Sequence, residues 1–423
     1  MIRFILADLR RLWAGAVVVV LLVALATALG VTVTLQERAL RLGSARAADK
    51  FDLVIGAAGS ETQLVLSSIF LQPAPLPLMP GGVLAKLSRD PRVAWVAPVG
   101  FGDSFAGYPL VGTTRALIGS TVSGFAAGRM FEKEGEAVVG AAVKLPVGAE
   151  IKPMHGTAQM GGETHAGVVY HVTGRLPATG TPWDRAILVP IQAVWHVHGL
   201  GDGHEHEDEQ HHEGEVTAAD YPDEDYDHHG AIDADAAIDE NFASDAPGLP
   251  AVLVKPKTIA DAYKLRQEYR NGNTLAVFPG EVLTGLYATL GDAKMVLSAV
   301  AAGSQGLVAA ALVLVTVTHI GQRRRQIGAL RAFGAPRLSV FAIVWFELFL
   351  LVALGIGLGF LTGLAAARLI ANAFTVKSGI ILPVGFTGED WRMALILIGA
   401  SAVLSAVPAV LAYRQSPAAA LRA

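Results

Sequence analysis

The chain of 423 residues contains no cysteine. Disulfide bonds and thiolate metal sites are therefore excluded, and cysteine usage gives no indication of the redox compartment. Charged residues make up only 17% of the sequence, whereas soluble proteins average about 25%. Hydrophobic residues make up 52%. A chain so poor in charge and so rich in apolar residues is typical of an integral membrane protein.

Several signatures of catalysis and nucleic-acid binding are also missing. The sequence has no G-x-x-x-x-G-K-[ST] phosphate-binding motif, no H-E-x-x-H and no G-x-S-x-G. It has no basic face interleaved with aromatic residues, so we expect no nucleic-acid partner. Its clustered carboxylates lie mostly in one hydrophilic stretch, where they would be too poorly positioned for acid–base chemistry. The sequence therefore predicts that this chain is not an enzyme and does not itself hydrolyse ATP.

Four apolar runs reach the length of about 20 residues that a membrane-spanning helix needs. They cover residues 13–34, 294–320, 338–373 and 393–413. The first run is longer than the h-region of a signal peptide, about 7–15 residues, so we expect an uncleaved anchor. Residues 35–293 mix helical and strand patterns, and the strands expected there include Val93–Pro98, Leu110–Gly112 and Ala186–Pro190. The predicted fold is an α-helical membrane protein with four transmembrane helices (one plus three) and a large α+β domain inserted between helices 1 and 2.

Arginine positions predict the orientation, because short loops rich in lysine and arginine remain in the cytoplasm. Arginines gather before the first run, between the second and third runs, and after the fourth. The segment 374–392 carries only Lys377 and Arg392, offset by Glu389 and Asp390. We therefore expect three segments in the cytoplasm: an amphipathic N-terminus at residues 1–12, a coupling loop or helix at 321–337 and a tail at 414–423. Residues 35–293 and 374–392 are expected outside.

Residues 195–249 are rich in histidine and acid and contain no lysine or arginine. With few large apolar residues, this stretch is predicted to be a mobile loop. Imidazole and carboxylate groups bind Zn²⁺ well, and a histidine-rich tract is typical of metal binding. The alternative is a solvated acidic loop. The candidate zinc ligands are His196, His198, His204, His206, His211, His212, His228 and His229. Outside this stretch, His155, His165 and His171 are expected to be structural.

The third apolar run carries one acid and a row of glycines. Glu347 lies inside the run, where a charge costs at least about 2.5 kcal/mol, so we expect it to face protein. A structural hydrogen bond explains it more simply than a role in substrate transfer. Gly355, Gly359 and Gly363 share one helical face, and such small residues let helices approach closely. That face fits either a dimer contact or packing within the chain.

The stretch from Arg323 to Arg337 reads RRRQIGALRAFGAPR. The pattern predicts a short helix that follows three arginines and ends at Gly334 and Pro336. It resembles the R-x-x-E-I-x-x-L-R-A-L-G-A loop of FtsX-like permeases, the type VII ABC transporter permeases typified by MacB and LolC/LolE. Gln326 stands where that family usually has glutamate. The tail at 415–422, QSPAAALR, is similar to the C-terminal tail of the family. The segment 51–60, FDLVIGAAGS, resembles the start of the family's periplasmic core domain.

The resemblance implies a permease subunit that transmits ATP-driven motion from a separate cytoplasmic ATPase, which holds ATP and Mg²⁺, to a MacB-like periplasmic domain. It implies the bacterial inner membrane and a homodimer or a heterodimer with a related permease. The family alone does not choose among lipoprotein, peptide, drug and metal-linked cargo. With the histidine-rich stretch, we expect lipoprotein or metal-linked (zinc) cargo, and a periplasmic metal-binding protein or lipoprotein as partner. The residues implied in coupling are Arg323, Arg324, Arg325, Gln326, Ile327, Leu330, Arg331 and Gly334.

Two other functions remain open from the sequence. One is a membrane activator of a periplasmic hydrolase, as in division-linked members of the same family. The other is a histidine-rich membrane metal sensor that works without an ATPase. The activator, like a transporter, would require an ATPase partner, whereas the metal sensor would not.

Overall fold

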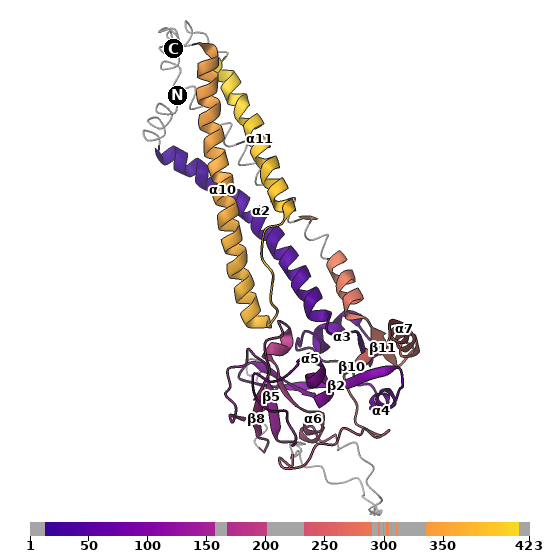
Figure 1. The fold of residues 1–423 in the computed structure, drawn as a ribbon. Coiled ribbons are helices and arrows are strands. Elements are labelled where there is room, and N and C mark those ends of the chain that lie inside the picture. The colour runs from indigo at the N-terminus through magenta and orange to yellow at the C-terminus, as the bar shows by residue number, and fades with distance from the viewer. Residues whose placement is uncertain are drawn as a thin grey trace, which may run out of the picture. The chain divides into compact units, whose positions relative to one another are not determined.

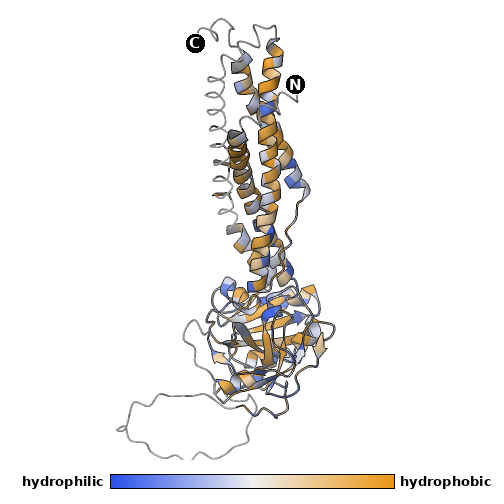
Figure 2. Ribbon diagram, turned by 90° about the vertical axis from the view of Figure 1, so that its left-hand side faces the viewer, coloured by the Kyte–Doolittle hydropathy of each residue, from blue (hydrophilic) through white to orange (hydrophobic). Residues whose placement is uncertain are grey.

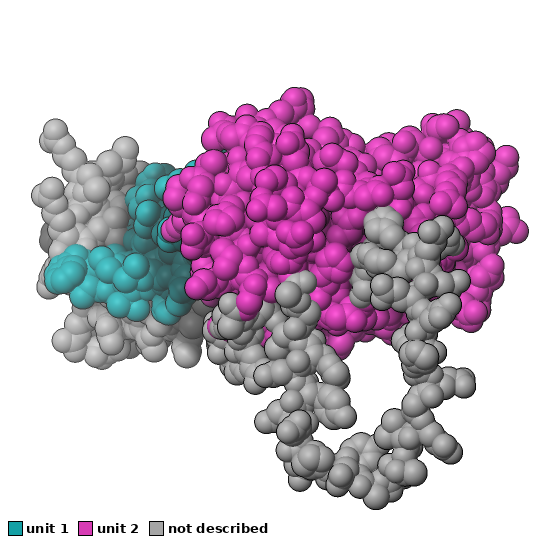
Figure 3. Space-filling view, turned by 90° about the horizontal axis from the view of Figure 1, so that it is seen from below, with its two compact units in different colours: residues 1–42, 288–373, 382–423 teal, residues 43–287, 374–381 magenta. Residues whose placement is uncertain are grey.

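The computed structural model describes residues 13–156, 167–200, 232–289 and 336–413, with a few single positions between 295 and 310. The chain divides into two compact units, coloured separately in Figure 3. Residues 1–42, 288–373 and 382–423 form one unit, which we call the helical unit. Residues 43–287 and 374–381 form the other, which we call the sheet unit.

The long helices are α2 (Trp13–Ala48), α10 (Arg337–Ser378) and α11 (Gly388–Tyr413). Among the described residues, three segments are long and apolar enough to cross a membrane: Trp13–Ala48, Leu338–Ser378 and Gly388–Val410. Figure 2 shows hydrophobic residues along most of their length. The structure thus fits a membrane protein with a large sheet-rich domain. The predicted span 294–320 lies outside the described residues except for single positions.

The glycine face of α10 packs against α2 within the same chain (Figure 1). A Cβ atom added to this face would come too close to α2 at each glycine: 2.6 Å from Val23 at Gly355, 2.5 Å from Thr27 at Gly359 and 2.9 Å from Val31 at Gly363. The contacts advance by four residues along both helices, so equivalent positions of the two helices meet turn after turn. Of the two arrangements that the sequence allowed, the structure shows packing within the chain.

The sheet unit is built on one sheet of eleven strands within the described residues, ordered β11-β1-β10-β2-β3-β9-β5-β8-β4, with β6 on β8 and β7 on β2. In the described part of the sheet, β3–β9 and β5–β8 pair in parallel and the other pairs are antiparallel. The strands are β1 (Leu53–Ala57), β2 (Val93–Phe105), β3 (Tyr108–Thr113), β4 (Ala127–Gly128), β5 (Glu136–Val139), β6 (Glu150–Ile151), β7 (Met154–His155), β8 (Tyr170–Arg175), β9 (Ile187–Pro190), β10 (Ala251–Pro256) and β11 (Thr274–Val277).

Short helices complete the sheet unit. They are α3 (Glu61–Ser68), α4 (Gly82–Ser88), α5 (Arg115–Thr121), α6 (Ile191–Val197), α7 (Ile259–Glu268) and the 3₁₀ turn η2 (Pro182–Arg185). Side-chain caps start two of them, since Ser60 accepts from the Gln63 amide and Thr258 from the Asp261 amide. The predicted mixture of helices and strands is confirmed for this unit.

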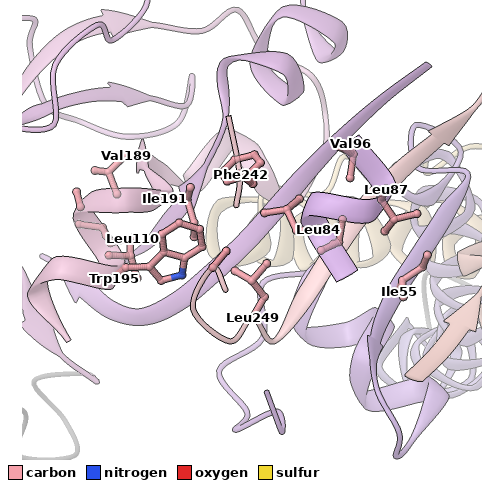
Figure 4. Packing of buried hydrophobic residues seen from close by; sticks show 14 of the residues in the cluster. Ile55, Leu84, Leu87, Val96, Leu110, Val189, Ile191, Trp195, Phe242 and Leu249 are labelled. Atoms are coloured by element: carbon pink, nitrogen blue, oxygen red, sulfur yellow. The ribbon is translucent and has the colours of Figure 1, made fainter. Parts of the chain in front are cut away.

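The core of the sheet unit corrects one prediction. Trp195, the first residue of the stretch expected to be a mobile loop, is fully buried in α6, where it packs edge-on against Phe242 (Figure 4). Leu249, the last residue, is buried in the same cluster. The two ends of the stretch are therefore part of the folded domain. The sequence pattern did not predict this, because the many acidic residues between the two ends outweighed their few apolar side chains. Residues 201–231 lie outside the described residues.

Two glycines let α6 lie directly on the sheet. Gly100 in β2 and Gly112 in β3 are paired in register. A Cβ at Gly100 would lie 2.7 Å from the Ile191 Cδ1 atom, and one at Gly112 would lie 2.5 Å from the Val194 Cγ2 atom. The absence of side chains at this pair therefore sets the height of α6 above β2 and β3, and with it the position of the histidines at its C-terminal end.

Candidate metal centre

A cavity of about 1370 Å³ lies within the sheet unit. Much of its wall is aromatic or aliphatic, including Phe70, Leu71, Phe101, Phe105 and Leu249. Among the polar side chains in this wall, Asp103, His155 and His198 lie close together. They are a group that could share a metal ion.

The three side chains come from separate elements that meet at one place. Asp103 lies near the end of β2, His155 in β7, and His198 follows α6 as its C-cap. The Nδ1 atom of His155 lies 3.3 Å from Asp103 Oδ1, and the Nε2 atom of His198 lies 3.6 Å from the same oxygen. The ligand atoms of all three lie within 4.8 Å of one another.

Backbone pairing fixes His155 beside Asp103. The two residues are partners in the antiparallel register of β2 and β7. The Gly156 amide donates to the Gly102 carbonyl at 2.7 Å, and the Ser104 hydroxyl donates to the Gly156 carbonyl at 2.6 Å. Because both bonds hold Gly156, the residue after His155, to the two neighbours of Asp103, they help to place the imidazole next to the carboxylate.

Helix α6 orients the ring of His198. Its Nδ1–H donates to the Val194 carbonyl at 2.8 Å, one turn earlier in the chain. The opposite ring nitrogen, Nε2, is the one that faces Asp103. The hydrogen bond with Asp103 raises the pKa of the His198 imidazole above its ordinary value, although burial acts in the other direction.

The centre is closed on the carboxylate side and open on one histidine side. The side chains of Asp103, His198 and His155 are 2%, 23% and 58% exposed, respectively. Burial also raises the pKa of the nearby Tyr170 hydroxyl well above its usual range, and the charges of Asp103 and Glu134 add to that shift. A carboxylate so enclosed is costly unless a positive charge lies beside it.

His196, two residues earlier, is held elsewhere. Its Nδ1 atom lies 2.5 Å from Oε1 of Glu134, a buried carboxylate. Burial raises the pKa of Glu134, and the hydrogen bond with His196 counteracts that shift. Within the described ranges, the one group of three such side chains close enough to share an ion is Asp103, His155 and His198. The structure therefore gives different partners to His196 and His198, the two candidate histidines of the stretch that it describes.

The other predicted site residues can be located as follows. Glu347 lies half-buried in α10. Outside the described residues lie the histidine candidates His204, His206, His211, His212, His228 and His229. The implied coupling residues Arg323, Arg324, Arg325, Gln326, Ile327, Leu330, Arg331 and Gly334 also lie outside them.

Sequence reasoning missed Asp103 and assigned His155 a structural role. Neither residue stands in a motif, since Asp103 is a single acid in a strand and His155 a single histidine before a glycine. The pairing of β2 with β7 joins them, and no local pattern encodes that pairing.

Comparison with known proteins bears on the helical part of the chain. Residues 298–418 match the model of the FtsX-like permease C-terminal family. This part of the chain is an FtsX-like permease region. The resemblance predicted from the sequence is thereby confirmed. A permease of this family is a membrane component of a transporter and is not itself a catalytic enzyme. The matched range includes α10, α11 and the arginine-rich stretch at 323–337.

Among solved structures, the chain is similar to the extracellular domain of a noncanonic ABC-type transporter, YknZ, from Gram-positive bacteria. The two are 11% identical, and the alignment covers 53% of this chain and 98% of that one with a TM-score of 0.28. No curated protein matches the chain.

Proposed function

We propose that the chain is the permease subunit of an ABC transporter and works with a separate cytoplasmic ATPase. The observation that carries this proposal is the match of residues 298–418 to the FtsX-like permease family. The apolar helices α2, α10 and α11 supply the membrane part, and the sequence has no phosphate-binding loop of its own. ATP hydrolysis therefore belongs to a partner.

The arginine-rich stretch is the proposed contact with that ATPase. Arg323, Arg324 and Arg325 precede Ile327 and Leu330, whose spacing places both apolar side chains on one face of a helix. The basic side chains would meet acidic ATPase surface or lipid headgroups, while the apolar pair would fill a groove. Motion of the ATPase would then be transmitted to the domain outside the membrane, with two permease subunits in the assembly, either identical or related.

Purification of the tagged full chain from membranes of its native host tests the coupling. We expect an ATPase with a phosphate-binding loop to copurify, and we expect reversal of Arg323, Arg324 and Arg325 to glutamate to release it. A matched control reverses Lys50, Lys257 and Lys264, which are exposed in the sheet unit, and should retain the ATPase. Recovery of no ATPase with the unaltered chain would contradict the proposal and favour a metal sensor without an ATPase.

Two cargo classes have support in the sheet unit. The cluster of Asp103, His155 and His198 favours metal-linked cargo, because its nitrogen and oxygen atoms suit Zn²⁺. The apolar part of the same cavity favours an acyl chain of a lipoprotein as the second candidate. Growth of the host under zinc limitation separates the two classes. Loss of the chain should impair growth only at low zinc if the cargo is metal-linked, whereas defective lipoprotein localisation at all zinc levels would favour the second class.

A further inference from the structure

We infer that Asp103, His155 and His198 form a Zn²⁺ site on the wall of the cavity. Each residue offers one ligand atom, and the ligand set is two imidazole nitrogens and one carboxylate oxygen. The inference rests on the proposed function, because it names the ion and the protein ligands that would bind metal-linked cargo. Binding of the ion can nevertheless be measured without the ATPase and without transport.

The spacing of the ligand atoms fits a tetrahedral ion. Bonds of about 2.1 Å to a tetrahedral centre place neighbouring ligand atoms about 3.4 Å apart. Asp103 Oδ1 lies 3.3 Å from His155 Nδ1 and 3.6 Å from His198 Nε2, which brackets that spacing. The two histidine nitrogens lie within 4.8 Å of each other, so rotation of the imidazole rings would bring all three atoms within reach of one ion.

The orientation of His198 is that of a metal ligand. Because its Nδ1–H donates to the Val194 carbonyl, the neutral ring carries its lone pair on Nε2, on the side of Asp103. Metal-bound histidines usually donate their other N–H to a carbonyl or carboxylate in this way.

The chemistry of the donors selects among ions. Ca²⁺ and Mg²⁺ prefer six or more oxygen ligands, which this centre lacks. Imidazole with carboxylate is a set that suits Zn²⁺. With three protein ligands, a tetrahedral ion has one position left for water or for a group on the cargo. The exposed side of His155 gives the ion a way in and out.

Zinc binding by the full chain in detergent tests the inference, once six histidines of the histidine-rich stretch 195–249 are replaced by glutamine. This parent variant removes binding by His204, His206, His211, His212, His228 and His229. Competition with a chromophoric chelator should show one Zn²⁺ per chain, retained in excess Mg²⁺. In this background, His155→Ala should weaken binding by about tenfold or more. The matched control is His171→Ala, since His171 is also exposed and lies in a strand of the same sheet.

A second variant tests the carboxylate without removing bulk from the core. Asp103→Asn keeps the shape of the side chain and removes its charge. Cobalt added to the parent should give the intense visible absorption of a four-coordinate ion, and Asp103→Asn should lose it. Absence of stoichiometric zinc from the parent, or equal zinc affinity in the parent, His155→Ala and Asp103→Asn, would overturn the inference. Zinc binding without any copurifying ATPase would instead overturn only the proposed function.

Discussion

Arg38 of α2 and Asp390 of α11 form a bidentate ion pair inside the helical unit. The Nη1 atom lies 2.7 Å from Oδ2 and the Nη2 atom 2.9 Å from Oδ1. The two side chains are 14% and 8% exposed. Asp390 also accepts hydrogen bonds from the amide and hydroxyl of Thr387. The pair thus joins residues at opposite ends of the sequence where a charge alone would be costly.

Breaking this pair should destabilise the helical unit strongly. Arg38→Ala leaves the Asp390 carboxylate buried and uncompensated, so we expect the free energy of unfolding to fall by about 3–5 kcal/mol. Thermal unfolding of the purified protein in detergent measures the change. Replacing both partners, by Arg38→Met with Asp390→Leu, should recover much of the loss. Arg41→Ala is the control, since its pair with Glu37 is exposed and worth less than about 1 kcal/mol.

A methyl group on the glycine face of α10 should disturb its packing on α2. At Gly359 an added Cβ would lie 2.5 Å from Thr27 Cβ, so Gly359→Ala forces the two helices apart and should cost about 1–3 kcal/mol. At Gly357 no atom lies within 4 Å of the added Cβ. Gly357→Ala should therefore leave stability unchanged or raise it by up to about 1 kcal/mol through helix propensity. Equal effects of the two substitutions on thermal unfolding would contradict the packing described.

A methyl group under α6 should weaken the proposed zinc site from a distance. Gly112→Ala places a Cβ 2.5 Å from Val194 Cγ2, which lifts α6 from the sheet and moves His198 away from Asp103. We expect zinc affinity to fall while the ligands themselves are unchanged. Gly119→Ala in α5 meets no atom within 4 Å and serves as the control. Chelator competition in the parent variant with six histidines replaced by glutamine measures both, and unchanged affinity of Gly112→Ala would show that α6 does not position His198.

Much of the sheet unit could be predicted from local patterns, and its ion-binding cluster could not. The strands at Leu110–Gly112 and Ala186–Pro190 were predicted because short apolar runs are bounded by turn residues. Strand β2 was predicted to end at Pro98 but continues to Phe105, because Gly100 and Gly102 read as turn residues. Their strand conformation is set by the pairing of Gly100 with Gly112 in β3 and by the hydrogen bond from the Gly156 amide to the Gly102 carbonyl.

The histidines show the same limit. Composition singled out the stretch that contains His196 and His198, but it could not show that one ring meets Glu134 and the other Asp103. The β2–β7 pairing places Asp103 beside His155, and the packing of α6 on Gly100 and Gly112 positions the two histidines at its end. Long-range packing decides them, and a single sequence carries no local signal for it.

The ion pairs around Arg92 should make the sheet unit sensitive to acid. The guanidinium contacts Asp90 and Glu268 at 2.6 Å each, and its hydrogen bonds lower the pKa of both carboxyl groups. The stabilisation is therefore complete above the unfolded pKa values, about 3.9 and 4.3, and is lost as the pH falls through the lower folded values. Denaturant unfolding between pH 6 and pH 2, about the range of these titrations, should show this loss. Arg92→Met should flatten that part of the profile.

Crosslinking from the arginine-rich stretch tests the central claim most directly. The natural chain has no cysteine, so a single Gln326→Cys substitution gives one reactive position. In native membranes, a thiol crosslinker at this position should join the chain to an ATPase, and an impermeant maleimide should reach it only after the membrane is opened. Lys264→Cys in the sheet unit should be labelled in intact spheroplasts and form no such crosslink. Labelling of the Gln326→Cys variant from outside, or no crosslink from it to any ATPase, would contradict the account.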